Sequence, residues 1–390
     1  MFLYSKTAFD LVKNAHEGDK ASIRHIIDFG EKYSLSGNLI QHYISYLIMT
    51  DENPFSLSLE RKRGNGSSEE FAKKDLCDVY NLFFEVFPLL NNYRPIGRIT
   101  GNEDVRRAKL IEQFSSSLAQ AASFEVFFST IKDFYVNYGV GFFGLNKAFY
   151  MKDDGSIMPV SHIKEFTFDS IRGYESQKHK LITNTEAFVS NGVGNNVLLY
   201  GDSGTGKSTS IKAVLNMFYD KGLRMIQVQK HQFVHLGELT DLLKTRNYKF
   251  ILYMDDLSFE DFEVEYKYLK AAIEGGLQEK PDNVLIYATS NRRHIIKETF
   301  TDREGGDDVH RNESIQEKIS LSERFGMMIY YPKPTQSEFF DMAVFLAERE
   351  GLDIDEEILI SEARKWGVAH GGLSGRTAEQ FINFMKAENK

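Results

Sequence analysis

The sequence contains almost no cysteine and no long apolar run, and both absences exclude classes of protein. Cys77 is the only cysteine, so no disulfide can form within the chain and no cysteine cluster can bind zinc or an iron–sulfur centre. We expect Cys77 to be a small buried side chain. No apolar stretch approaches the length of a membrane-spanning helix, and no charged-then-apolar export signal opens the sequence. These absences favour a cytoplasmic protein without a membrane partner.

The remaining composition is typical of a folded protein. Of the 390 residues, 42% are apolar and 26% are charged, which suits two or three domains with a sizeable core. The net charge of −9 argues against a general nucleic-acid coat protein, although it does not exclude a local basic groove. A short basic run, Arg61-Lys62-Arg63, is interpreted as a solvated surface rather than a contact for phosphate backbones.

An apolar run that ends at Gly201 leads into a glycine-rich stretch with the spacing G-x-x-x-x-G-K-[ST]. Its glycines allow a tight turn that brings backbone N–H groups close to phosphate oxygens. Lys207 supplies a positive charge for the β- and γ-phosphates, and the Ser208 hydroxyl is a ligand for Mg²⁺. A helix that begins near Lys207 directs its positive end at the same anion. The predicted nucleotide-binding residues are Gly201, Asp202, Ser203, Gly204, Thr205, Gly206, Lys207, Ser208 and Thr209.

A second apolar strand, predicted over 250–256, ends in two acids. Asp255 is placed to hold Mg²⁺, directly or through water, together with Ser208. Asp256 is the candidate for orienting or deprotonating the attacking water. An acidic strand end is a weak signal alone. It becomes a strong one because it follows the glycine-rich loop after a single intervening strand.

Hydrophobic periodicity divides the chain into segments. Residues 1–150 show the three- and four-residue apolar spacing of helices, so we predict a helical N-terminal domain with a role in partner binding. Residues 151–166 are predicted to form a linker or a small hairpin. From 167 to 333, strands alternate with helices, which indicates an α/β core of about five parallel strands; 334–390 are predicted to form a small helical lid. Ligands of such sheets bind beyond the carboxyl ends of the strands.

From about residue 165 onward these pieces resemble the AAA+ ATPases. Residues 287–291, Tyr-Ala-Thr-Ser-Asn, are similar to the sensor 1 strand of that superfamily, which implies that Asn291 helps to place the attacking water. Residues 321–326, Leu-Ser-Glu-Arg-Phe-Gly, resemble the motif that carries an arginine finger. The resemblance therefore implies that Arg324 completes the nucleotide site of a neighbouring subunit.

Two further motifs of that superfamily have similar stretches here. Residues 373–378, Leu-Ser-Gly-Arg-Thr-Ala, resemble the start of a lid helix that carries the sensor 2 arginine, which would be Arg376. Residues 171–174, Ile-Arg-Gly-Tyr, resemble the segment that packs on the adenine, which would place Ile171 and Gly173 at the base.

More narrowly, several stretches resemble a bacterial AAA+ family known as domain-of-unknown-function 815. That family is similar to the branch that contains helicase loaders and transposition helper ATPases. The resemblance implies an ATPase core and names no substrate. The stretches are Leu198–Ser208, Asp255–Glu260, Glu274–Leu277 and Ala288–His294.

The predicted function is Mg²⁺-dependent hydrolysis of ATP to ADP and phosphate in order to remodel or load an unidentified protein client. ATP is preferred to GTP because no guanine-reading motif follows the core. An arginine finger implies an assembly of identical subunits, as a ring or a short filament. The predicted catalytic residues are Lys207, Asp256, Asn291, Arg324 and Arg376.

Other interpretations stay open. The second acid of AAA+ proteins is usually glutamate, whereas Asp256 is one methylene shorter, and a retracted carboxylate loses catalytic value. The protein would then be an ATP-gated loader or adaptor with little turnover. Another alternative is a helper that acts on nucleic-acid complexes. The surroundings of Arg292 and Arg293 stay open: these arginines face DNA, a client, a neighbouring protomer or solvent. Phe233 is either a client-gripping aromatic or part of the core.

Overall fold

The structure is a computed structural model of the chain, and its residues separate into two compact units. Residues 1–62, 64, 66–97, 101–259, 264–274, 281–291, 321 and 323–388 are described. The first unit contains residues 1–149 and 158–164, and the second contains residues 150–157 and 165–390. No helix among the described residues is both long and apolar enough to cross a membrane.

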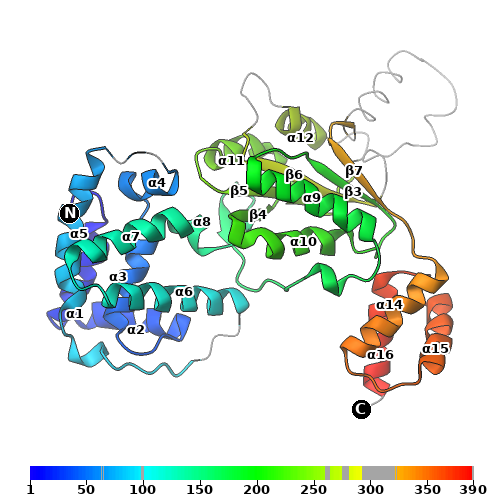
Figure 1. The fold of residues 1–390 in the computed structure, drawn as a ribbon, viewed down its shortest axis with the longest axis horizontal. Helices are drawn as coiled ribbons and strands as arrows, with labels where there is room; N and C mark the ends of the chain where they lie inside the picture. The colour runs from blue at the N-terminus through cyan, green and yellow to red at the C-terminus, as the bar shows by residue number, and fades with distance from the viewer. Residues whose placement is uncertain are drawn as a thin grey trace. The chain divides into compact units, whose positions relative to one another are not determined.

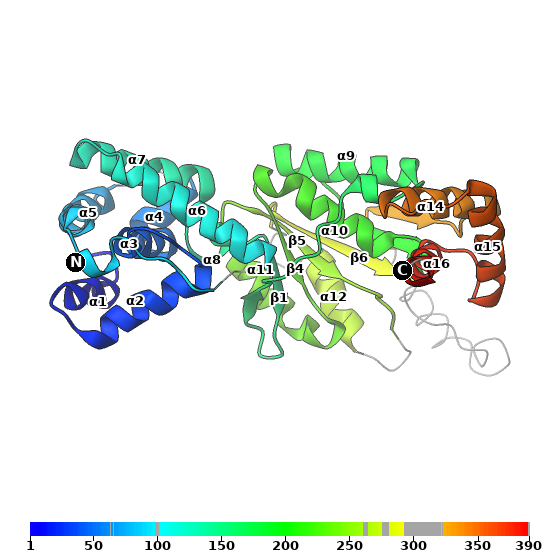
Figure 2. The ribbon, with the colours of Figure 1, turned by 90° about the horizontal axis from the view of Figure 1, so that it is seen from below.

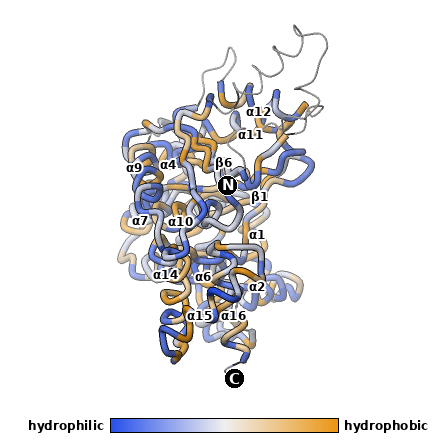
Figure 3. Tube along the Cα trace, turned by 90° about the vertical axis from the view of Figure 1, so that its right-hand side faces the viewer, coloured by the Kyte–Doolittle hydropathy of each residue, from blue (hydrophilic) through white to orange (hydrophobic). Residues whose placement is uncertain are grey.

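The first unit is a bundle of helices packed around α3 (Figure 1). Most residues of α3 are buried, because this helix is apolar on nearly every side and contacts α1, α2, α5, α6 and α8. Among the other helices, α1, α2, α6 and α7 combine apolar and polar residues along their length, as the hydropathy colouring of Figure 3 shows. Their bounds are α1 (Lys6–His16), α2 (Lys20–Tyr33), α3 (Leu39–Thr50), α4 (Pro54–Glu60), α5 (Ser68–Phe84), α6 (Asn102–Ala119), α7 (Phe124–Tyr138) and α8 (Gly141–Leu145).

The expectation that Cys77 is buried is wrong. Cys77 lies on α5 and is exposed. The buried side of this helix is formed by Ala72, Leu76, Val79 and Phe83, which recur at spacings of three and four residues. Cys77 immediately follows one of these positions and therefore points to another side of the helix.

A seven-stranded sheet has the strand order β2-β1-β4-β5-β6-β3-β7. Its strands β3 to β7 belong to the second unit, whereas β1 and β2 each include residues of both units. The five strands from β4 to β7 are parallel to their neighbours, which confirms the predicted α/β class. β1 and β2 form a hairpin beside β4, and β1 begins at Ala148, before the range 151–166 that was predicted to be a linker or hairpin. The strands are β1 (Ala148–Met151), β2 (Ile157–Pro159), β3 (Val197–Gly201), β4 (Leu223–Gln227), β5 (Lys249–Met254), β6 (Val284–Ser290) and β7 (Met327–Tyr331).

Helices cover both faces of this sheet, as Figure 2 shows. α9 (Glu175–Asn191) and α10 (Lys207–Phe218) lie on one face, and α11 (Leu236–Leu243) and α12 (Glu265–Glu274) lie on the other. Every residue of β6 is buried, as expected for a central strand covered on both faces. Because β3, β5 and β6 run in the same direction, the segments after their carboxyl ends meet at one edge of the sheet.

Three helices complete the second unit: α14 (Gln336–Arg349), α15 (Glu356–Ala369) and α16 (Gly375–Glu388). They share a core of Phe339, Ala343, Ala363, Ala378 and Phe381. Trp366 is only partly buried and packs at the edge of this cluster. These helices, called the lid below, belong to the same compact unit as the sheet.

Candidate nucleotide-binding site

The glycine-rich loop connects β3 to α10, and three of its glycines have a positive φ. The φ angles of Gly201, Gly204 and Gly206 are 137°, 77° and 88°, in the region that residues with a Cβ atom rarely occupy. At Gly201, a Cβ atom would lie 2.0 Å from the backbone oxygen of Tyr331 on β7. The predicted residues 201–209 therefore form a tight turn that ends in the first turn of α10.

Lys207 is the first residue of α10, and its side chain folds back over the loop. Its Nζ donates hydrogen bonds to the backbone oxygens of Gly201 (2.7 Å) and Asp202 (2.6 Å) and to Oδ1 of Asn291 (3.3 Å). The side chain is buried, and this burial lowers the pKa of the ammonium group even though Asp202, Asp256 and Asp255 oppose the shift. The ammonium group of Lys207 therefore lies at the glycine-rich loop, beside Asn291.

Asp255, directly after β5, accepts two short hydrogen bonds. Ser208 Oγ and Thr289 Oγ1 each donate to Oδ1 of Asp255, both at 2.7 Å. Burial raises the pKa of this carboxyl, but the hydrogen bonds from Ser208 and Thr289 outweigh that effect, so the pKa is lower than the usual 3.8. The carboxylate is therefore ionised at neutral pH and lies beside the hydroxyl of the glycine-rich loop.

Asp256 and Asn291 form a second pair beside Asp255. The side-chain Nδ2 of Asn291 donates to Oδ1 of Asp256 at 2.7 Å, and the backbone N–H of Asp256 donates to Thr289 Oγ1 at 2.9 Å. Asp256 has a φ of 52°, in the left-handed region, which turns the chain away from the strand direction. The two residues predicted to position water are thus in contact with each other.

The donor atoms at this edge fit Mg²⁺. A hydroxyl (Ser208) and a carboxylate (Asp255) lie in hydrogen-bond contact, and Mg²⁺ typically takes one or two such protein oxygens together with phosphate oxygens and water. No group of three or more histidine, cysteine or acidic side chains suited to a metal occurs among the described residues. The structure therefore offers an incomplete set of ligands that a bound nucleotide would complete.

Arg376 approaches the loop from the lid. Its Nη1 lies 3.5 Å from Oγ of Ser203. The lid and the loop are close there, because a Cβ atom on Gly204 would lie 2.8 Å from Oγ of Ser374, and one on Gly375 would lie 3.2 Å from the oxygen of Gly204. Of the two predicted arginines, Arg376 is therefore the one that reaches the glycine-rich loop of its own chain.

Arg324 is instead paired with Glu274, the last residue of α12, through an ion pair that involves Nε. Its predicted role in a neighbouring subunit stays a prediction. The predicted contacts of Arg292 and Arg293 lie outside the described residues, as do Arg63 and parts of the family-like stretches beyond Phe259 and Glu274.

The predicted adenine-contacting segment lies before α9. Gly173 has a φ of 79°, and the Met342 side chain of the lid lies 3.9 Å from where its Cβ would be. Ile171 is nearly buried and helps to line a cavity of about 440 Å³ between this segment, α9 and the lid. That cavity is lined by Phe168, Asp169, Ile171, Arg172, Glu175, Lys178, His179, Ile182 and Phe345. The contact of Ile171 and Gly173 with a base stays a prediction.

Phe233, for which sequence left two interpretations, is fully buried. It lies in the 3-10 helix Lys230–His235, with its ring 6.2 Å from that of Phe259. The structure therefore assigns Phe233 to the core and not to a client-gripping loop.

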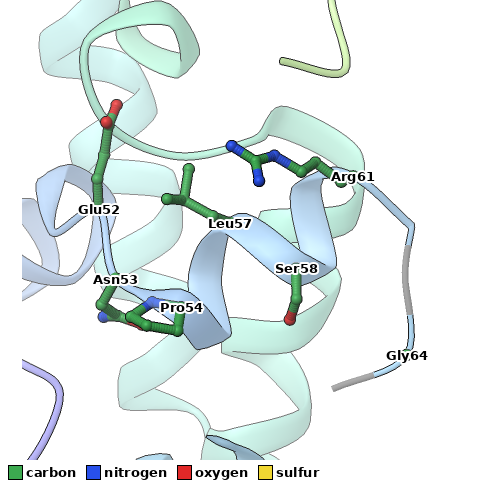
Figure 4. A pocket seen from close by; sticks show the side chains of 7 residues that line it. All are labelled: Glu52, Asn53, Pro54, Leu57, Ser58, Arg61 and Gly64. Carbon is green, nitrogen blue, oxygen red and sulfur yellow. The ribbon is translucent and has the colours of Figure 1, made fainter. Parts of the chain in front are cut away.

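The first unit has a separate cavity of about 450 Å³, shown in Figure 4. In that view, Leu57 lies between the side chains of Glu52 and Arg61. None of the predicted site residues lines this cavity. It is lined by Glu52, Asn53, Pro54, Leu57, Ser58, Arg61 and Gly64.

Sequence reasoning gave no role to Thr289. Its hydroxyl donates to the carboxylate of Asp255 and accepts from the backbone N–H of Asp256, the two acids that follow β5. The register of β5 and β6 pairs Met254 with Ala288, so Asp255 lies beside Thr289. The only hint of this role in the sequence is that Thr289, a hydroxyl residue, directly follows the apolar residues 284–288. Its partner could be identified only once the two strands were aligned.

Together these features define the class of the protein. A parallel sheet with the glycine-rich strand β3 between β6 and β7, acids after β5 and a helical lid constitute a P-loop nucleotide-binding protein of the AAA+ ATPase type. The chain belongs to the family described as "Protein of unknown function (DUF815)", whose model matches residues 145–389.

Solved chains of the RuvB Holliday junction branch migration motor from Thermotoga maritima are also similar. One shares 17% sequence identity, with a TM-score of 0.42, over 58% of this chain and 65% of that chain. A mutant RuvB chain shares 17% identity, with a TM-score of 0.40, over 57% of this chain and 64% of that chain. The match thus spans less than two thirds of RuvB. No protein with a curated description matches this chain.

Proposed function

We propose that the protein is a cytoplasmic, Mg²⁺-dependent ATPase that hydrolyses ATP to ADP and phosphate and thereby remodels or loads a protein client. One observation carries the proposal: hydrogen bonds of 2.7–3.3 Å join Lys207 to Asn291, Asn291 to Asp256, and Ser208 to Asp255 at one edge of the sheet. A strand end that had only a structural role would not need a buried ammonium group beside two carboxylates.

Each of these side chains has a role that follows from its surroundings. Lys207 would exchange backbone oxygens for phosphate oxygens, and its burial strengthens that attraction because the local dielectric constant is low. Ser208 and Asp255 would hold Mg²⁺, which neutralises phosphate charge during the reaction. Asp256 and Asn291 would orient the attacking water. Arg376 would couple phosphate binding to the position of the lid.

The proposal includes an assembly of identical subunits in which Arg324 acts on the nucleotide of a neighbour. Within its own chain, Arg324 is paired with Glu274. The Arg324 side chain is about a quarter exposed. To act on a neighbouring nucleotide, Arg324 would exchange the carboxylate of Glu274 for a phosphate.

A second candidate function is an ATP-gated loader or adaptor in which binding, and not turnover, is the signal. The hydrogen bond between Asp256 and Asn291 supports this candidate. The carboxylate of Asp256 and the amide of Asn291 bind each other, so neither group is directed at an attacking water. The short side chain of Asp256 supports it as well.

The test is to measure phosphate release and assembly mass together, with and without ATP, in wild type, Arg324→Ala and Glu274→Gln. If Arg324 acts across subunits, Arg324→Ala binds ATP but loses turnover by roughly 10³-fold, whereas Glu274→Gln retains turnover. If Arg324 only stabilises α12, the two variants behave alike. Arg349→Ala, which breaks an exposed ion pair in the lid, is the matched control and should match wild type.

The variant Asp256→Asn separates the two candidate functions. For an ATPase, loss of this base lowers turnover by roughly 10²- to 10⁴-fold without loss of ATP affinity. For a switch, wild-type turnover is already low and Asp256→Asn leaves both turnover and ATP-dependent assembly unchanged. A wild-type protein that binds no ATP refutes both.

A further inference from the structure

Thr289 is the last residue but one of β6, and it is buried between the two acids that follow β5. Its Oγ1 donates to Oδ1 of Asp255 at 2.7 Å and accepts from the backbone N–H of Asp256 at 2.9 Å. The backbone oxygen of Thr289 also accepts from the N–H of Leu257, at 2.7 Å. One residue of β6 therefore makes a hydrogen bond to each of three consecutive residues after β5.

These bonds lie on both sides of an unfavourable backbone conformation. Asp256 has a φ of 52°, and a residue with a Cβ atom keeps a positive φ only where its surroundings hold it there. The N–H of Asp256 is fixed by the Thr289 hydroxyl, and the next N–H along the chain is fixed by the Thr289 backbone oxygen. Together the two bonds set the direction of the Asp256 side chain, whose carboxylate accepts from Nδ2 of Asn291 at 2.7 Å.

A hydroxyl suits this position because the group there must donate and accept at the same time. The ionised carboxylate of Asp255 can only accept a hydrogen bond, whereas the backbone N–H of Asp256 can only donate one. The hydroxyl of Thr289 supplies a proton to the first and a lone pair to the second. Hydrogen bonds that follow one another in this way strengthen each other. Valine, which has nearly the same shape as threonine, could make neither bond.

We propose that Thr289 is a positioning residue whose hydroxyl holds the water-orienting Asp256 in a fixed place relative to the metal-binding Asp255. This inference rests on the proposed function, which gives the two acids these roles. Without the hydroxyl, the N–H of Asp256 loses its acceptor, and the residue can relax from its positive φ to the common backbone regions. Its carboxylate then moves, and a displacement of about 1 Å is enough to lower a rate by roughly 10²-fold. Asp255 keeps its hydrogen bond from Ser208, so binding of the nucleotide changes little.

The test is the variant Thr289→Val in the full chain. Phosphate release is measured over a series of ATP concentrations with MgCl₂ in excess, and amide hydrogen exchange of Asp256 is measured in the nucleotide-free protein. The expected kcat is roughly 10- to 100-fold below that of wild type, whereas the KM for ATP stays within about threefold. Exchange of the Asp256 amide should be roughly 2- to 13-fold faster, as for the loss of one hydrogen bond. Thr289→Ser keeps the hydroxyl and should restore both quantities.

A double-mutant cycle with Asp256→Asn shows whether Thr289 acts through Asp256, because that variant keeps the backbone N–H that the hydroxyl accepts from. If it does, adding Thr289→Val to Asp256→Asn lowers kcat by less than about twofold, measured in a single turnover with enzyme in excess. Two effects that multiply in full would mean that Thr289 acts elsewhere, and they would overturn the inference.

Thr185→Val is the matched control, because it removes a buried hydroxyl of α9 that lies 2.8 Å from the hydroxyl of Tyr287 on β6. It should lower the melting temperature and leave kcat unchanged, as expected for a hydroxyl with a purely structural role. If Thr289→Val behaves in the same way, the inference is wrong while the ATPase proposal stands. If wild type itself releases no phosphate, the proposed function fails, and the role of Thr289 in the reaction fails with it.

Discussion

Replacing Gly204 with alanine tests whether the lid rests on the glycine-rich loop in solution. A Cβ atom at Gly204 would lie 2.8 Å from Oγ and 3.0 Å from Cβ of Ser374, and 3.2 Å from Cβ of Arg376. These distances are shorter than the roughly 3.5–4.0 Å of normal contacts between carbon atoms. The start of α16 must therefore move away from the loop.

Two costs contribute to the effect, and a control separates them. An alanine with the φ of Gly204 (77°) has a strain of about 1–2 kcal/mol. Gly222 has a φ of 90°, and no atom lies within 4 Å of the position that a Cβ atom would take there. Gly222→Ala therefore has the same kind of strain without a clash. The clash adds about 1–3 kcal/mol, as for overpacking in a core, and this part is specific to Gly204→Ala.

The assay is amide hydrogen exchange of Thr377 and Ala378, whose N–H groups bond to Ser374 Oγ and O respectively. A cost of about 1–3 kcal/mol corresponds to exchange that is roughly 5- to 150-fold faster in Gly204→Ala than in Gly222→Ala. A Ser374→Gly background should reduce the difference at Ala378, because it removes the clashing side chain and keeps the backbone acceptor of the Ala378 N–H. Equal exchange in the two alanine variants would refute contact between lid and loop.

Three further changes have definite expected outcomes. Because the folded pKa of Asp255 is lowered, its carboxylate stabilises the protein above pH 3.8 and loses this effect as the pH falls below that value; the destabilisation by Asp255→Asn, measured by urea unfolding, should therefore shrink in acid. Thr335→Ala removes the capping box of α14 and should cost about 1 kcal/mol, whereas Thr335→Ser should be neutral by the same measurement. Phe233→Ala should cost about 3–5 kcal/mol because the ring is fully buried; a loss below about 1 kcal/mol in urea unfolding would contradict its place in the core.

The sequence predicted the parts of the fold that depend on local signals. The glycine-rich loop lies between a strand and a helix, as its motif requires. These signals are local because apolar runs and glycine spacing fix the backbone within a few residues. For the same reason the α/β class and the order of strands and helices in the second unit followed from sequence.

What the sequence could not supply are contacts between distant segments. The bridge from Thr289 to Asp255 depends on the register of β5 and β6, and the partner of Arg324 is 50 residues away on α12. The prediction for Cys77 failed for a different reason: the average burial of cysteine was given more weight than the helical spacing of Leu76 and Val79.

The hairpin of β1 and β2 has a consequence for synthesis on the ribosome. All residues of the first unit have been made once residue 164 is added, so that unit can fold while translation continues. The hairpin pairs with β4, which begins only at Leu223, about 3–12 s later at the usual rate of roughly 5–20 residues per second. An isolated two-stranded hairpin is marginally stable at best. During this interval its open edge is available to chaperones and to other nascent chains, and the arrival of β4 ends that exposure.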